Sequence, residues 1–208
     1  MDLTLWLAFV AASTALLAIP GPTILLVMSY ALSQGRRVAV ASATGVALGD
    51  LIAMTASLAG LGALVLASAT LFTVLKWVGA VYLIWLGIKL WRSAKTVSLA
   101  DMTVSEVSPR AVFTHATVVT ALNPKSIVFF IAFVPQFIRP EASLLQQFAI
   151  LIATFVGLAT INALLYALLA DRMRAGLRRP SVLRGLTRAG GGALVAMGAI
   201  TALTRRTA

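Results

Sequence analysis

Two short segments interrupt long apolar runs and place helix-breaking residues at their centres. Asn-Pro-Lys at 123–125 lies in the apolar run from about 111 to 138, and Pro-Gly-Pro at 20–22 lies in the run from 3 to 32. A proline inside a helix costs roughly 3 kcal/mol, and a lysine at the centre of a membrane helix costs about 2.5–3.5 kcal/mol on insertion scales. Two such penalties at adjacent positions indicate a function. We therefore predict that the two breaks face each other and form a substrate site.

Two further polar residues lie within apolar runs. Asp50 follows Gly45 and Gly49 in the run from about 38 to 66, and Asn162 lies in the run from about 144 to 170. Ionisable residues in membrane helices usually mark transport pathways, although Asp50 could instead form a purely structural pair with Lys125. Asn162 could belong to the site, or it could stabilise helix packing through a hydrogen bond to a neighbouring helix. The two glycines, four residues apart, are predicted to be packing positions where helices approach closely.

The composition indicates an integral membrane protein. The 208-residue chain is 60% hydrophobic and only 11% charged, whereas a soluble domain averages about 25% charged residues. The absence of Cys excludes disulfide and thiol redox chemistry, and the single His115 disfavours a His-built metal site. Because no zinc-protease motif or other catalytic constellation is present, we expect no enzymatic activity, no metal and no cofactor.

Six apolar runs are read as transmembrane helices, of which the last, at about 189–203, is the shortest. Of the 17 Lys and Arg residues, 12 lie in the loops after the first, third and fifth runs, and 4 lie on the opposite side. The positive-inside rule places the larger set in the cytoplasm and both termini outside it. The net charge of +11 is therefore assigned to membrane orientation and contact with anionic lipid. Nucleic acid is not an expected partner.

The two halves of the chain show weak internal similarity. Each half begins with a run broken by proline and ends with a glycine-rich run. We predict an all-α integral membrane protein with six transmembrane helices in two three-helix repeats, residues 1–92 and 111–208, joined by a cytoplasmic linker, residues 93–110. The first helix of each repeat is broken at Pro. An odd number of spans inverts the second repeat, as in many secondary transporters, whose sites lie at interrupted helices.

The sequence also resembles the LysE/RhtB family of amino-acid exporters over nearly its whole length. The most specific stretch runs from the Asn-Pro-Lys segment to Pro-Gln-Phe at 135–137, and it includes Phe129, Phe130 and Phe133. The resemblance implies proton-driven export of small amino acids across the bacterial inner membrane. The other residues that carry the resemblance are Pro20, Gly21, Pro22, Gly45, Gly49, Asp50, Lys76, Gly79, Tyr82, Leu83 and Gly87.

An amino acid is a zwitterion, so its site needs one partner for each charged end. Half-helix N–H groups or Lys125 would hold the carboxylate, and unwound carbonyls or Asp50 would hold the ammonium. Alternatively, Asp50 pairs with Lys125 in the empty state and releases it on protonation, and in either case we expect Asp50 to carry the coupling proton. The predicted substrate-binding residues are Pro20, Gly21, Pro22, Asn123, Pro124, Lys125 and Asn162.

Other substrates remain open on the same fold. An efflux permease for an inorganic ion or another small metabolite is the alternative, although His, Asp and Glu are scarce in the apolar runs. The expected partners are the amino acid, protons and membrane lipids. A homo-oligomer is also compatible with the sequence.

Overall fold

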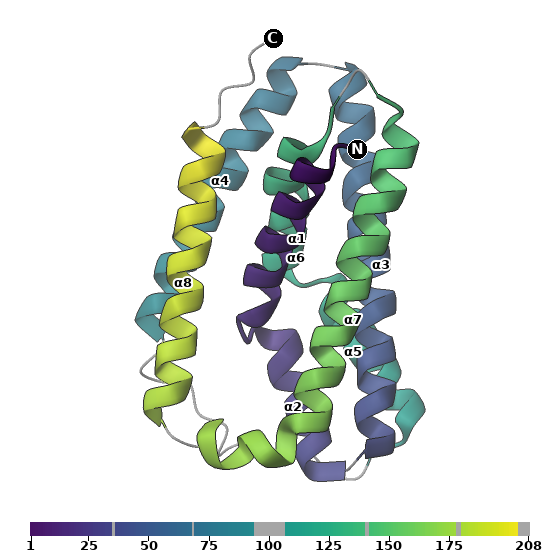
Figure 1. Cartoon of the computed structure of the whole chain (residues 1–208), viewed down its shortest axis with the longest axis vertical. Coiled ribbons are helices and arrows are strands. Elements are labelled where there is room, and N and C mark those ends of the chain that lie inside the picture. The colour runs from purple at the N-terminus through teal and green to yellow at the C-terminus, as the bar shows by residue number, and fades with distance from the viewer. Residues whose placement is uncertain (35, 68, 94–106, 140–141, 178–179, 204–208) are drawn as a thin grey trace.

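The computed structural model describes residues 1–34, 36–67, 69–93, 107–139, 142–177 and 180–203, and regular structure in these ranges is helical, as predicted. Figure 1 shows the helices side by side in one elongated bundle. In chain order they are α1 (Leu3–Ala18), α2 (Pro22–Gln34), α3 (Arg36–Ala67), α4 (Ala69–Ser93), α5 (Pro109–Ala121), α6 (Pro124–Val128), η1 (Phe129–Phe133), η2 (Val134–Phe137), α7 (Leu144–Leu177) and α8 (Pro180–Leu203).

Successive passes of the chain run in opposite directions along the bundle. In Figure 1, α1 and α2 together descend, α3 returns, α4 descends behind α8, and α5 with α6 climbs again before α7 descends and α8 rises. As a result, α1 begins and α8 ends at the same end of the molecule. The helices α1 and α6 lie in the middle of the bundle, between the α4–α8 pair and the group formed by α3, α5 and α7.

The first predicted break is present. The Asp2 side chain accepts a hydrogen bond from the Thr4 amide at 3.3 Å and caps the start of α1. The helix ends at Ala18, and α2 begins at Pro22 after a bend of 56°. Proline suits this first helical position because its missing N–H would have no intrahelical partner there.

The second predicted break is also present, and the helix that follows it is irregular. The helix α5 ends at Ala121, and α6 starts at Pro124 after Asn123, whose side-chain oxygen accepts from the Lys125 amide at 3.0 Å. After Val128 the helix widens into the π-helical turn η1 and then tightens into the 3₁₀ turn η2. The sequence analysis did not predict these two turns. Short π-helical turns occur often at functional sites.

Three segments are long and apolar enough to cross a membrane by length and composition, among the residues described. They are Arg37–Gly60, Pro109–Phe137 and Leu144–Leu169. The bent pair Leu3–Ala18 and Thr23–Ala31 makes a fourth if it is counted as one span. In α4 the apolar stretch is shorter, Trp77–Lys89. The criterion therefore supports three or four of the six spans that the sequence predicts.

Small residues let the helices approach closely at two interfaces. A Cβ atom on Gly49 would lie 2.6 Å from the Thr120 Cβ atom, and one on Gly45 would overlap the carbonyl oxygen of Phe113, so α3 packs against α5 at these glycines. On the other side, Gly87 of α4 faces Gly191 of α8, where an added Cβ would lie 2.5 Å from the opposing carbonyl oxygen. These glycines allow close contact between α3 and α5 and between α4 and α8.

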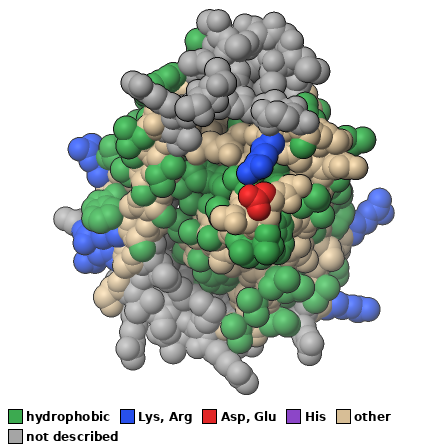
Figure 2. All heavy atoms as spheres, turned by 45° about the horizontal axis from the view of Figure 1, so that its top comes forward, with side chains coloured by type: hydrophobic (Ala, Val, Ile, Leu, Met, Phe, Trp, Pro, Cys, Tyr) green, Lys and Arg blue, Asp and Glu red, His purple; other side chains and the backbone are tan. Residues whose placement is uncertain are grey.

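At the end where α1 begins, the connection from η2 to α7 is fixed by Gln147. Its side-chain amide accepts from the Arg139 N–H and donates to the Arg139 carbonyl, both at 2.8 Å. The Arg139 side chain in turn forms an ion pair with Asp2 at 3.3 Å. Figure 2, which brings this end forward, shows basic and acidic side chains in contact within a largely apolar and backbone surface.

Candidate functional site

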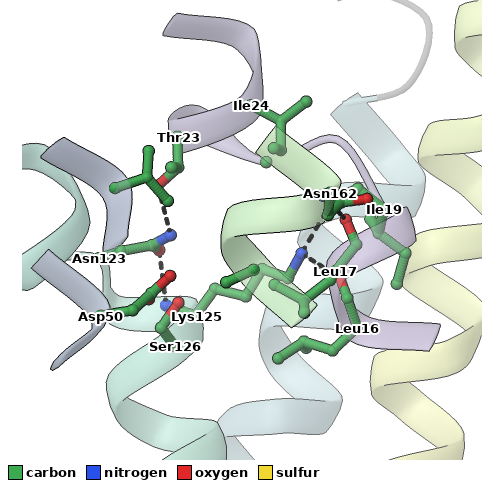
Figure 3. A pocket seen from close by; sticks show the side chains of 13 residues that line it. Leu16, Leu17, Ile19, Thr23, Ile24, Asp50, Asn123, Lys125, Ser126 and Asn162 are labelled. Carbon is green, nitrogen blue, oxygen red and sulfur yellow. Dashed lines mark hydrogen bonds between the residues drawn. The ribbon is translucent and has the colours of Figure 1, made fainter. Parts of the chain in front are cut away.

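The first break leaves carbonyl groups without helical partners, and Lys125 binds two of them. A helix always leaves its last four carbonyls unpaired within the helix. The Lys125 Nζ atom donates to the Leu16 carbonyl oxygen at 2.8 Å and to the Ile19 carbonyl oxygen at 3.1 Å. Figure 3 shows the lysine side chain reaching from α6 across to the end of α1. The cation of the second break therefore binds the backbone of the first.

The two carbonyls between them are bound by α7. The Asn162 side-chain amide donates to the Leu17 carbonyl oxygen, and the Tyr166 hydroxyl donates to the Ala18 carbonyl oxygen, each at 3.0 Å. Residues four apart lie on the same face of a helix, so α7 presents both donors together. Side chains from the second half of the chain thus bind the carbonyls of Leu16, Leu17, Ala18 and Ile19 at the end of α1.

Asn123 joins the two breaks a second time. Its side-chain oxygen caps α6, while its Nδ2 atom donates to the Thr23 hydroxyl at 3.1 Å. Thr23 is in the first turn of α2, and its hydroxyl also accepts from Thr120 at 3.5 Å. The prediction that the two breaks face each other is confirmed by these contacts.

A small cavity of about 30 Å³ lies between the two breaks. This space is enough for a water molecule, and it is too small for an amino acid, so a substrate enters only if the walls move. Figure 3 shows the polar side chains of the lining converging from several helices. The lining residues are Leu16, Leu17, Ile19, Gly21, Thr23, Ile24, Val46, Asp50, Asn123, Lys125, Ser126, Ala159 and Asn162.

Asp50 brings a carboxyl group from α3 into this lining. The residue is only 3% exposed. The ion pair with Lys125 that the sequence suggested for the empty state is not formed, because the lysine binds the α1 carbonyls instead. Within the described part of the chain, the one ion pair joins Arg139 and Asp2 at the surface. Asp50 therefore lies in the cavity wall without a salt bridge to a described residue.

The structure brings together four of the seven residues that the sequence predicts to bind substrate. Gly21, Asn123, Lys125 and Asn162 line the cavity, and Asp50, the predicted proton carrier, lines it with them. A Cβ atom on Gly21 would lie 3.6 Å from the Lys125 Nζ atom, so the backbone there runs beside the lysine.

Pro20 and Pro124 lie outside the lining. Pro20 is buried, Pro124 is exposed at the start of α6, and Pro22 begins α2. Their contribution is to the backbone, because each ends or starts a helix and leaves neighbouring groups free. Gly45 and Gly49 lie against α5 and not in the cavity wall.

Several lining groups were not predicted. The hydroxyl of Thr23 and the side chain of Ser126 belong to the lining, and Tyr166 completes the cap of α1. Unwound carbonyls were expected as a class, and the structure identifies those that bind an ammonium as the carbonyls of Leu16 and Ile19. The spacing of Tyr166 four residues after Asn162 was a signal that could have found it. The particular carbonyls that take part could not be identified from the sequence, since every residue has one.

Metal binding finds no support in the described residues. No group of three or more His, Cys, Asp or Glu side chains in those ranges could hold a metal ion. The polar groups of the cavity are instead backbone carbonyls, amides, hydroxyls, one carboxyl and one ammonium. Such a set can bind both ends of a zwitterion by hydrogen bonds and charge.

Comparison with known proteins identifies the same family that the sequence motifs resemble. A family model described as LysE type translocator matches residues 6–205. The homoserine/homoserine lactone efflux protein of Salmonella typhimurium is 38% identical over 200 residues, which cover 96% of this chain and 97% of that protein. An uncharacterized membrane protein of Vibrio cholerae is 33% identical over 205 residues, covering 99% of this chain and 100% of that one.

A leucine efflux protein of an Enterobacter species is 31% identical over 157 residues, covering 75% of this chain and 74% of that protein. No solved structure matches the chain. The predicted resemblance is confirmed, and with it the prediction of a multi-pass membrane transporter and not an enzyme. The chain belongs to the family of LysE type translocators.

Proposed function

We propose that this protein exports small neutral amino acids or their close derivatives, homoserine among them, through the cavity between the two helix breaks. The observation that carries the proposal is the convergence of Lys125, Asn123, Asp50 and the carbonyls at the end of α1 on one cavity. The substrate class is supported by the homologous proteins, which are named for efflux of homoserine, homoserine lactone and leucine.

The lining can bind each part of such a substrate. The carbonyl oxygens of Leu16 and Ile19 accept hydrogen bonds from an ammonium group, and they already do so from Lys125. The first N–H groups of α2 have no partner within the helix and attract a carboxylate. The hydroxyls of Thr23 and Ser126 could bind a substrate hydroxyl, while Ile24, Val46 and Ala159 supply apolar walls.

Asp50 is the proposed site of proton coupling. A carboxylate that is buried without an ionic partner is costly, and protonation removes that cost. A proton taken up from outside the cell would therefore neutralise Asp50, and its release to the cytoplasm would restore the charge. Because Asp50 and the substrate groups share one cavity, occupancy by one changes the electrostatic environment of the other.

The proposed architecture is six transmembrane spans in two inverted repeats, residues 1–92 and 111–208, joined by the cytoplasmic linker 93–110. Three relationships support it. Each half begins with a helix broken at proline. The helix that follows each broken one packs on the broken helix of the other half, α3 on α5 and α7 on α1 and α2. The last helices of the halves, α4 and α8, pack on each other. In this arrangement the positive-inside rule places both termini outside the cytoplasm of a bacterial inner-membrane protein.

Transport by everted membrane vesicles tests the proposed function. Vesicles with and without the protein are given an acidic interior, and uptake of radiolabelled homoserine, leucine and lysine is measured. Export from the cell appears here as uptake, and we expect homoserine to accumulate only in vesicles that contain the protein. The Gly60→Ala variant, in which the added Cβ meets no atom within 4 Å, should behave like the wild type. Accumulation of none of the amino acids by correctly inserted protein would reject the proposal.

A further inference from the structure

Lys125 occupies a position that an amino-acid substrate would also require. Its ammonium donates to two carbonyl oxygens at the end of α1, at 2.8 and 3.1 Å. An α-ammonium group has the same charge and the same three donors as a lysine ammonium. The carbonyls of Leu16 and Ile19 are therefore already arranged to bind one ammonium, and they cannot bind two at full strength.

We propose that the Leu16 and Ile19 carbonyls form the ammonium subsite of the transporter, and that Lys125 fills this subsite until a substrate displaces it. The inference rests on the proposed function and adds a specific competition to it. Lys125 then acts as an internal substitute for the substrate, which keeps the α1 carbonyls paired while the cavity is empty. An unpaired carbonyl inside the membrane would otherwise be costly.

The geometry allows the displaced ammonium to be bound elsewhere. Lys125 is in the short helix α6, directly after the second break, and its flexible side chain lies beside Gly21, where no side chain obstructs it. Asp50 lines the same cavity and forms no salt bridge with a described residue. After displacement, Nζ can turn toward Asp50 or toward the carboxylate of the bound substrate. The Lys125 ammonium then has a partner both before and after binding.

The competition makes a distinct prediction about substrate chemistry. The substrate ammonium is essential, because only an ammonium can replace that of Lys125 on the carbonyls. The substrate carboxylate strengthens binding through the displaced Lys125 but is not required. Homoserine lactone keeps the ammonium and lacks the carboxylate, whereas N-acetylhomoserine keeps the carboxylate and lacks the ammonium. Comparing the binding of these two compounds distinguishes the contribution of the substrate ammonium from that of the carboxylate.

Binding to the purified full-length protein in lipid nanodiscs tests the inference by calorimetry, at a mildly acidic pH where the lactone amine is protonated. The ligands are homoserine, homoserine lactone and N-acetylhomoserine, and the variants are Lys125→Met and Tyr166→Phe. Tyr166→Phe is the matched control, since it removes one hydrogen bond from the end of α1 without opening the proposed subsite. The wild type should bind homoserine and the lactone but not the acetylated compound.

Lys125→Met should bind the lactone on the order of tenfold more tightly than the wild type does, because a charge-assisted competitor has been removed. Its affinity for homoserine should improve less or fall, since the partner of the carboxylate is lost. Tyr166→Phe should leave the ratio of the two affinities unchanged. Unchanged or weaker lactone binding by Lys125→Met, while the wild type binds homoserine, would overturn the inference alone. Failure of the wild type to bind either ligand would overturn the proposed function as well.

Discussion

Asp50 and Lys125 line the same cavity, yet the lysine ammonium binds the end of α1 and forms no ion pair with the carboxyl group in the described structure. The two side chains come from different halves of the chain, on α3 and α6. Each is therefore able to respond to a bound substrate or proton without first breaking a direct bond to the other. This separation leads to the first prediction.

Replacing Asp50 with Asn removes the titratable group and keeps its size. We expect Asp50→Asn to abolish the dependence of homoserine uptake on an imposed pH gradient, so that uptake falls to the level measured without a gradient. Exchange of labelled for unlabelled homoserine should continue, because the substrate groups of the cavity remain. The measurement compares both rates in everted vesicles.

Asp2→Asn is the matched control for this variant. It makes the same chemical change at an exposed residue whose only ion pair in the described structure is with Arg139 at the surface, where such pairs contribute about 1 kcal/mol or less. Gradient-driven uptake should survive there. If Asp50→Asn also retained it, another group would have to carry the coupling proton.

Asn123 has two separable roles, and two substitutions distinguish them. Asn123→Asp keeps the oxygen that caps α6 but loses the N–H donor to Thr23. Asn123→Ala loses both. Loss of a helix cap costs about 1 kcal/mol, so thermal unfolding should show Asn123→Ala to be less stable than Asn123→Asp. Equal stability of the two variants would show that the cap contributes little.

Close packing of α3 against α5 depends on glycine. A Cβ atom at position 49 would lie 2.6 Å from the Thr120 Cβ atom and 2.7 Å from the Thr117 carbonyl oxygen. Overpacking of this kind costs about 1–3 kcal/mol, so Gly49→Ala should lower the unfolding temperature. Gly60→Ala on the same helix meets no atom within 4 Å and should not. An unaltered unfolding temperature for Gly49→Ala would contradict this packing.

The predicted orientation can be read from single cysteines, because the chain has none of its own. Ser108 and Ser143 are both exposed and flank the segment from α5 to η2 on opposite sides. In intact cells, a membrane-impermeant maleimide should label Ser143→Cys from outside. Ser108→Cys should react only in everted vesicles. The reverse pattern would place the termini in the cytoplasm.

The helix breaks could be predicted from the sequence because proline acts on its own backbone. Pro22 and Pro124 each begin a helix in the structure, as local chemistry requires. Asp50 and Lys125 could be singled out for a similar reason, since an ionisable residue in an apolar run is conspicuous whatever surrounds it.

The partners of the free backbone groups could not be predicted in this way. Which side chains bind the carbonyls of Leu17 and Ala18 depends on how α7 packs against α1, and that packing is set by the whole bundle. The π-helical turn at Phe129–Phe133 is equally a product of tertiary packing. A pair with Asp50 in the empty state was one of the alternatives for the lysine, and carbonyls from a distant segment bind it instead.

The most direct test of the cavity as substrate site uses Ser126→Cys. Ser126 lines the cavity and is only 7% exposed, and cysteine differs from serine by one atom. The rate of thiol labelling by a small methanethiosulfonate reagent is measured on purified, transport-competent protein with and without saturating homoserine, with Ser108→Cys as the control. The account predicts that homoserine slows labelling of Ser126→Cys severalfold and leaves that of Ser108→Cys unchanged. Equal labelling of Ser126→Cys with and without homoserine would contradict it.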